Sequence, residues 1–149
     1  MAAVARRLAF LGDGHNKFLE SVVVWLDIVA PRYFWQEFDT YRVGVTRQSE
    51  STMHTIAKRP LEPGDFAHPV PAAHLAHLNR LIAEGRWEET KWDLPESFLQ
   101  RRIVSANYMA LQRIVRQRAR HRLPEWHEFI DQLVRSVEHP EYVKEREAS

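Results

Sequence analysis

The stretch ESVVVWLDIVAPRYFWQEFDTY, residues 20–41, decides the fold class, because its apolar pattern changes period at Pro31. From Glu20 to Val29 the apolar residues fill both alternating faces: Val22, Val24, Leu26 and Ile28 on one, Val23, Trp25 and Val29 on the other. This pattern predicts a strand with most of both faces covered. Pro31 is tolerated in the first turn of a helix, and aromatic residues follow at helical spacing, so a short helix is expected from about Pro31 to Tyr41.

The centre of the chain is less regular. Residues 43–58 are polar and rich in Ser and Thr, which predicts a loop with a possible short strand or helical turn. Four prolines and a glycine exclude regular structure from residues 59–71 and indicate a connector inside one domain. A helix is expected from about Ala72 to Glu84, with Gly85 as its C-cap.

A second informative stretch is LPESFLQRRIVSANYMALQRIVRQR, residues 94–118. Its apolar residues recur with a period near 3.6, at Ile103 or Val104, Tyr108, Leu111, and Ile114 or Val115. They predict a long amphipathic helix from Pro95 to about Arg120, and Pro124 begins another to about Val137. The expected class is α+β, helix-dominated, with a small β-sheet and long amphipathic C-terminal helices.

Composition limits the possibilities further. With 149 residues and 44% hydrophobic content, the chain is expected to form a single domain over 1–149, with a poorly defined N-terminus at 1–13 and a charged tail at 141–149. No apolar run reaches the roughly 20 residues of a membrane span, and we expect no signal peptide, so a cytoplasmic location is predicted. Absence of cysteine excludes thiol nucleophiles, disulfides and thiolate metal sites.

Charge is unevenly distributed along the chain. The net charge is +1, yet seven arginines fall within residues 101–122 without a single acid: Arg101, Arg102, Arg113, Arg116, Arg118, Arg120 and Arg122. This indicates either an anionic partner or charge pairing with the acidic segment after Leu123, within the protein or across a subunit contact.

Arg118 extends the apolar stripe of the predicted helix, and Asn107 lies on the neighbouring row. A buried charge costs several kcal/mol unless it is paired or reaches water, so Arg118 requires a partner. Two alternatives stay open. The guanidinium binds phosphate or a pyrimidine carbonyl through bidentate contacts, or it pairs with an acid of the last helix while Arg101 and Arg122 reach solvent.

Together the two stretches resemble the flavin-dependent thymidylate synthase family. The first, extended to residues 14–42, matches without a gap at Gly14-His15-Asn16, Glu20, Ala30-Pro31 and Arg42. The second matches at Leu94-Pro95, Arg101, Asn107, Leu111 and Arg118. Between them, residues 49–54 (SESTMH) are similar to the family signature Asn-Glu-x-Ser-x-Arg, with Glu50, Thr52 and His54 on its Glu, Ser and Arg.

The resemblance implies binding of deoxyuridine monophosphate (dUMP) and FAD. It also implies methylation of the pyrimidine with methylenetetrahydrofolate and NADPH, in a homotetramer with sites between subunits. The nucleotide would contact Arg118, Lys91, Glu50, Ser51, Thr52 and His54. The flavin would contact His15, Tyr41, Arg42, Ser49, Asn107, His121 and Arg122. No protein nucleophile and no metal are expected.

Other interpretations remain for particular residues. Thr40-Tyr41-Arg42 stands where the family has Arg-His-Arg, which leaves open a non-catalytic nucleotide- or nucleic-acid-binding protein on the same scaffold. A structural assembly protein is a third possibility. Ser and Thr in loops commonly satisfy their own backbone, which is the alternative for Ser51 and Thr52. His68, His74 and His77 are expected on a solvated surface, and Trp87 and Trp92, near Lys91, in the core.

Overall fold

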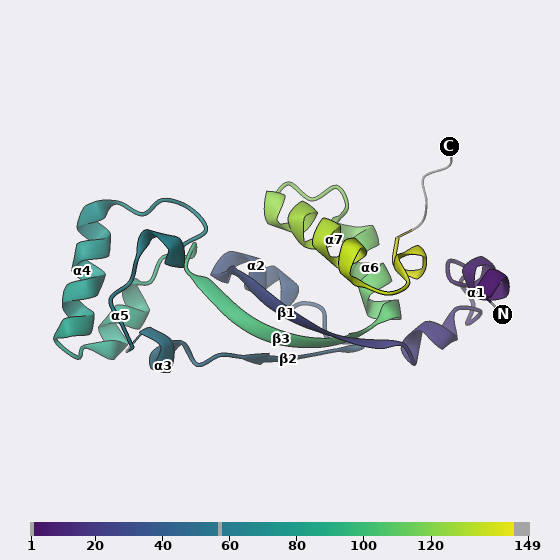
Figure 1. The fold of residues 1–149 in the computed structure, drawn as a ribbon, viewed down its shortest axis with the longest axis horizontal. Helices are drawn as coiled ribbons and strands as arrows, with labels where there is room; N and C mark the ends of the chain where they lie inside the picture. Colours follow the sequence, from purple (N-terminus) through teal and green to yellow (C-terminus); the bar gives the residue numbers. More distant parts are fainter. Residues whose placement is uncertain (1, 57, 145–149) are drawn as a thin grey trace. The chain divides into compact units, whose positions relative to one another are not determined.

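The computed structural model describes residues 2–56 and 58–144. Three strands, β1 (Val23–Pro31), β2 (Val45–Ser49) and β3 (Leu99–Asn107), form one sheet in the order β1-β3-β2 (Figure 1). Tyr108 N donates to Val22 O beyond one end of the β1–β3 pair and Arg32 N donates to Phe98 O beyond the other, so these strands are antiparallel. Strand β2 is also antiparallel to β3, because Asn107 N donates to Gly44 O and Glu50 N donates to Arg101 O.

Helices account for most of the remaining regular structure. They are α1 (Ala2–Leu8), α2 (Arg32–Phe38), α3 (Thr52–Ile56), α4 (Ala72–Ala83), α5 (Trp87–Asp93), α6 (Tyr108–Arg118) and α7 (Pro124–Ser136). Short 3-10 turns are η1 (Lys17–Glu20), η2 (Pro63–Asp65) and η3 (Pro140–Tyr142). The predicted class, helix-dominated α+β with a small sheet, is confirmed.

The predicted helix from Pro95 to Arg120 is wrong over its first half, where the chain forms β3 and only α6 is helical. Val104 and Tyr108 are both buried and four residues apart, a spacing that suits a helical turn and also two strand repeats. Val104 and Ala106 are buried while Arg101 and Ile103 are exposed, which is the alternation of a strand. Asn107 is therefore the N-cap of α6 and does not lie on an inner row of a helix.

The prediction that β1 is covered on both faces is also wrong. Val23, Trp25 and Val29 are 55%, 81% and 59% exposed, whereas Val24, Leu26 and Ile28 are half-buried. An antiparallel sheet can leave one face open, and an apolar run alone does not show whether anything covers it. The odd-numbered face of β1 is uncovered by the described residues.

Helices α2, α4 and α7 were predicted nearly correctly, because their ends carry strong local signals, whereas α1 and α5 were not predicted. Pro31 is the N-cap of α2 and Pro124 occupies the first turn of α7. Gly85, with φ of +69°, follows the C-cap of α4 in the left-handed conformation that glycine adopts without strain. The polar segment that follows Arg42 contains β2 and α3, the short strand and helical turn left open by the sequence.

Contacts cluster in two compact units, and the strands contribute to both. The first comprises Met1–Leu26, Thr40–Arg47 and Val104–Ser149, and the second comprises Asp27–Asp39 and Gln48–Ile103. The first unit contains α6 and α7, with Leu111, Ile114 and Trp126 in its core. The single-domain prediction stays a prediction. The charged tail predicted for residues 141–149 lies outside the described residues from 145 onward, while Tyr142 and Val143 are buried.

The second unit has its own core. Seven buried residues form one cluster, namely Ile56, Leu61, Phe66, Leu78, Ile82, Leu94 and Phe98. They come from α3, α4, the proline-rich connector and the segment between α5 and β3, so the connector contributes to packing although η2 is its one regular turn. No helix in the described part of the chain is long and apolar enough to cross a membrane.

Candidate functional site

In the first unit, Arg118 is held between two aromatic rings at the C-terminal end of α6. Its Nε donates to Tyr41 Oη at 2.8 Å. Its guanidinium carbon lies 5.5 Å from the centre of the Tyr41 ring and 4.7 Å from that of Trp126, which is fully buried in α7. Cation–π contact with a desolvated ring stabilises a half-buried guanidinium by about 1–2 kcal/mol. These contacts fix the orientation of Arg118.

The loop that carries Tyr41 is fastened to α6 at three points. Besides the Arg118 bond, an Arg113 guanidinium nitrogen donates to Val43 O at 3.0 Å and Asn107 N donates to Gly44 O at 3.0 Å. Two arginines of the acid-free stretch therefore have internal contacts to this loop. Asn107 Oδ1 accepts from Ala110 N at 2.9 Å, which caps the helix.

The remaining predicted flavin residues of the first unit differ in exposure. His121 is half-buried, accepts from Leu123 N at 3.2 Å through Nδ1, and contacts the Trp126 ring edge-on with centroids 6.1 Å apart. His15, Arg42 and Arg122 are exposed. The structure thus brings Tyr41, Arg118 and His121 together around Trp126, whereas His15, Arg42 and Arg122 have no described contact to this cluster.

In the second unit, the predicted nucleotide segment joins β2 to α3. Glu50 N donates to Arg101 O at 3.1 Å, which extends the ladder one residue beyond β2, and the Glu50 side chain is exposed. Ser51 O accepts from Thr55 N at 3.0 Å and from Thr55 Oγ1 at 2.9 Å. Thr52 Oγ1 accepts from Gln100 Nε2 at 2.9 Å. Thr52 therefore contacts a side chain of β3, unlike a loop hydroxyl bonded to its own backbone.

Further contacts link Gln100 to Arg102 and to the fully buried indole of Trp35. Arg102 donates to Gln100 Oε1 at 3.3 Å and to both oxygens of Asp39 at 3.0 and 3.1 Å. The Arg102 guanidinium lies 4.5 Å from the centre of the Trp35 ring. Trp35 Nε1 donates to Ala30 O at 3.0 Å and Gln100 O at 3.1 Å. The sequence did not indicate Gln100, Trp35 or Trp126 as site residues, because their roles depend on partners distant along the chain.

Ser49, His54 and Lys91 are exposed, at the end of β2, on α3 and on α5. Helix α5 packs against α3 within the unit. Trp87 packs against the core cluster as predicted, but Trp92 is 73% exposed beside Lys91, so its predicted core position is wrong. At the end of a short helix, Trp92 faces away from the buried side that contains Thr90.

Arg101, on β3, forms a close ion pair with Asp27 on β1. The hydrogen bond from the Arg101 guanidinium holds the pKa of the Asp27 carboxyl below its usual value. Both side chains are exposed, so this pair stabilises the sheet only weakly. Arg101 therefore has an internal partner and does not belong to the helix stripe with Arg118.

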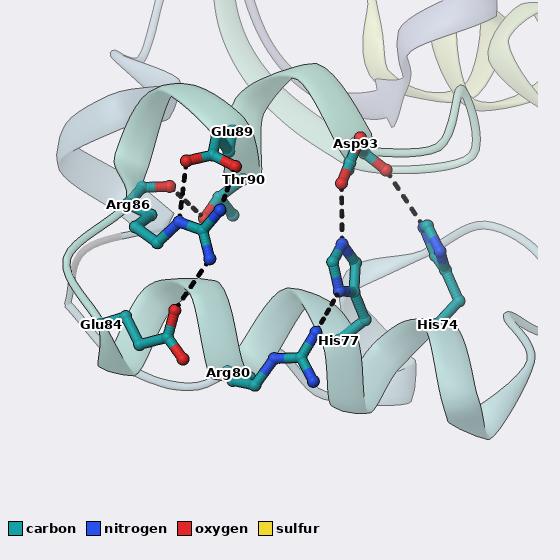
Figure 2. A network of polar contacts seen from close by, with 8 residues as sticks. All are labelled: His74, His77, Arg80, Glu84, Arg86, Glu89, Thr90 and Asp93. Atoms are coloured by element: carbon teal, nitrogen blue, oxygen red, sulfur yellow. Dashed lines mark hydrogen bonds and ion pairs between the residues drawn. The ribbon is translucent and has the colours of Figure 1, made fainter.

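A polar network links α4 to α5 (Figure 2). His77 Nε2 lies 2.8 Å from a carboxylate oxygen of Asp93, His74 Nε2 lies 3.1 Å from Asp93 O, and an Arg80 guanidinium nitrogen lies 3.0 Å from His77 Nδ1. Arg86 pairs with Glu84 and Glu89, and these bonds raise the pKa of Arg86. Within residues 2–56 and 58–144, no three His, Cys, Asp or Glu side chains are placed to hold a metal ion.

Comparison with solved structures gives the class of fold: the chain has the fold of flavin-dependent thymidylate synthases. One such structure is thymidylate synthase X from Helicobacter pylori with FAD and dUMP. It has a TM-score of 0.75 and 20% identity over 96% of this chain and 80% of the other. A second, flavin-dependent thymidylate synthase ThyX from Helicobacter pylori complexed with FAD and dUMP, has a TM-score of 0.77 and 20% identity. The match covers 96% of this chain and 81% of that one. No family model and no curated protein matches the sequence.

Proposed function

We propose that this chain is a flavin-dependent thymidylate synthase-like protein. It would bind dUMP and FAD and methylate the pyrimidine with methylenetetrahydrofolate and NADPH. The observation that carries the proposal is the match of 96% of the chain to a fold whose solved examples hold FAD and dUMP. The ungapped residue matches of the two stretches support it independently, because the order and identity of residues are separate from the path of the backbone.

In this proposal Arg118 and Lys91 bind the nucleotide as cations. The guanidinium of Arg118 is already oriented by Tyr41 and Trp126, so its rotamer entropy is largely lost before the ligand arrives. Ser51 and Thr52 would contact the phosphate, His54 would lie nearby, and Glu50 would accept from ribose or ring groups. No side chain needs to act as a nucleophile.

The described residues suit FAD in part. Arg42 and Arg122 are exposed and have no ion-pair partner among the described residues, so both are available to a pyrophosphate. His15 and Ser49 are exposed as well. Tyr41, Asn107 and His121 already make internal contacts, so they would support the flavin site mainly through the loop and helix that they hold. Bound flavin supplies the redox chemistry, and the protein supplies placement and electrostatics.

An assembly of subunits, a homotetramer in our proposal, would complete the site. Val23, Trp25 and Val29, exposed on the face of β1 that also carries the Asp27–Arg101 ion pair, support an oligomer, because large apolar side chains are commonly covered at interfaces. A cytoplasmic location is proposed with the function.

The test is the visible absorption spectrum of the purified protein with and without added FAD, together with tritium release from dUMP tritiated at C5. We expect flavin absorbance and tritium release. Arg118→Met should weaken dUMP binding about 10- to 100-fold, as expected for a lost bond between charged groups. Arg116→Met, on the exposed side of the same helix, is the matched control and should bind like wild type. A colourless protein without FAD affinity would contradict the flavin part of the proposal.

A second candidate function is nucleic-acid or nucleotide binding without catalysis. It is favoured by Arg116, Arg120 and Arg122, which are exposed and without an ion-pair partner in the described part of the chain. Because several arginines would neutralise phosphates, affinity for DNA should fall steeply with salt. Fluorescence anisotropy with single- and double-stranded DNA at about 50 and 200 mM salt tests this; no binding, or no salt dependence, rejects it.

A further inference from the structure

A hydrogen-bond chain in the second unit runs from Asp39 through Arg102 and Gln100 to Thr52. Its bonds are Arg102 to the Asp39 carboxylate at 3.0 and 3.1 Å, Arg102 to Gln100 Oε1 at 3.3 Å, and Gln100 Nε2 to Thr52 Oγ1 at 2.9 Å. The residues come from the end of α2, from β3 and from the start of α3. The chain therefore ties Thr52 to a carboxylate that it does not contact.

The direction of every bond in this chain is determined by its chemistry. A guanidinium group has only donors, so the amide oxygen of Gln100 must face Arg102. The amide nitrogen of Gln100 then faces Thr52, and the Thr52 oxygen must accept. The hydroxyl hydrogen of Thr52 consequently points elsewhere, and no described residue accepts it. Thr52 is thus an oriented donor.

Burial makes this arrangement rigid. The Arg102 side chain is only 14% exposed and lies on the Trp35 ring. The same indole donates to the backbone oxygen of Gln100. The buried side chain of Trp35 therefore contacts both Arg102 and Gln100, the two central residues of the hydrogen-bond chain. Donors that are held in place before a ligand arrives lose little conformational entropy on binding. Consecutive hydrogen bonds in such a chain also polarise and strengthen one another.

We propose that Gln100 and Arg102 are positioning residues that present the Thr52 hydroxyl as a donor to an anionic oxygen of the bound nucleotide, namely its phosphate. This inference rests on the proposed function. An anion is the fitting acceptor, because Lys91 is exposed on α5, which packs against α3, and adds a cation to the same unit.

The first test compares dUMP with deoxyuridine, which lacks the phosphate, by isothermal titration calorimetry of the full chain. Thr52→Val keeps the shape and removes the hydroxyl, so it should weaken dUMP binding about 10-fold or more and leave deoxyuridine within about twofold. Thr55→Val is the matched control, because the Thr55 hydroxyl donates to the backbone oxygen of Ser51, just before α3, and is not proposed to contact the nucleotide. It should bind both ligands like wild type.

The second test reverses the polarity of the chain with Gln100→Glu. The carboxylate accepts from Arg102 and from Thr52, so the Thr52 hydrogen is no longer available to a ligand. This variant should also weaken dUMP binding, and its effect should shrink when Thr52→Val is already present, leaving only repulsion by the added charge. Unfolding midpoints in the absence of ligand establish that each variant is folded.

The outcomes separate the two proposals. Suppose that wild type binds dUMP. If Thr52→Val binds dUMP equally well, or loses as much affinity for deoxyuridine as for dUMP, the positioning inference is overturned while the proposed function stands. If the effects of Gln100→Glu and Thr52→Val simply add, the donor role is likewise overturned. Wild-type protein that binds no dUMP overturns both.

Discussion

Replacement of Gly44 by alanine tests the contact between the Tyr41 loop and the start of α6. Gly44 has φ of +72°, a conformation that side chains with Cβ disfavour. A Cβ at this position would lie 2.7 Å from Asn107 Oδ1, the atom that accepts from Ala110 N. The added methyl group can be accommodated only if the Asn107 side chain moves and the helix loses its cap.

The expected magnitude is the sum of two effects. The left-handed conformation costs a residue with Cβ about 1–2 kcal/mol. Loss of an Asn cap costs about 1 kcal/mol. Gly44→Ala should therefore lower the free energy of unfolding by about 2–3 kcal/mol. In an Asn107→Ala background the cap is already absent, so the same change should cost only about 1–2 kcal/mol.

Urea unfolding followed by circular dichroism measures these values, provided that the transition is two-state. Gly12→Ala is the matched control, because a Cβ there meets no atom within 4 Å and its φ is not left-handed. That variant should change stability by less than about 1 kcal/mol. The reasoning is refuted if Gly44→Ala costs no more than Gly12→Ala, or if its cost is the same with and without Asn107.

Three further predictions concern other contacts. Tyr41→Phe keeps the ring but removes the bond to Arg118, and should lower the free energy of urea unfolding by about 1–2 kcal/mol; an unchanged value would mean that the bond is not formed in solution. Leu78→Ala should cost about 2–5 kcal/mol in the same assay, because Leu78 is fully buried; a loss below about 1 kcal/mol would contradict its core position. Arg59→Met should reduce the loss of stability in acid, measured as unfolding free energy from about pH 7 to about pH 3.

The sign of the last prediction follows from Asp65. A hydrogen bond from Arg59, at 2.6 Å, lowers the pKa of Asp65 below its ordinary value of 3.8. The resulting stabilisation is present above pH 3.8 and is lost as the pH falls through the lower pKa of the folded state. The difference between wild type and Arg59→Met should therefore narrow below about pH 4. A constant difference across that range would show that the pair is not responsible.

Local signals in the sequence were sufficient for several elements. Pro31, Pro124 and Gly85 mark helix ends because their backbone conformations restrict what can follow, whatever the rest of the chain does. The predicted class followed from these ends and from the change of period at Pro31. The family resemblance likewise depended on residue order, which folding does not alter.

The candidate site was only partly predictable. Arg118 was expected to need a partner because a guanidinium on a buried row cannot stay unpaired. Tyr41 and Trp126 could not be identified as its contacts, since they come from a separate loop and helix. Thr52 was identified by resemblance, but its donor direction depends on Gln100, Arg102 and the buried Trp35.

By itself the sequence determined which residue types are available, where helices begin and end, and the family pattern. Tertiary structure alone decided that residues 99–107 form a strand, because a spacing of four satisfies both a helix and a strand until hydrogen-bond partners on β1 and β2 select one. It also decided which arginines are available to a ligand, since a guanidinium is committed only when a carboxylate, carbonyl or ring from elsewhere in the chain lies within reach.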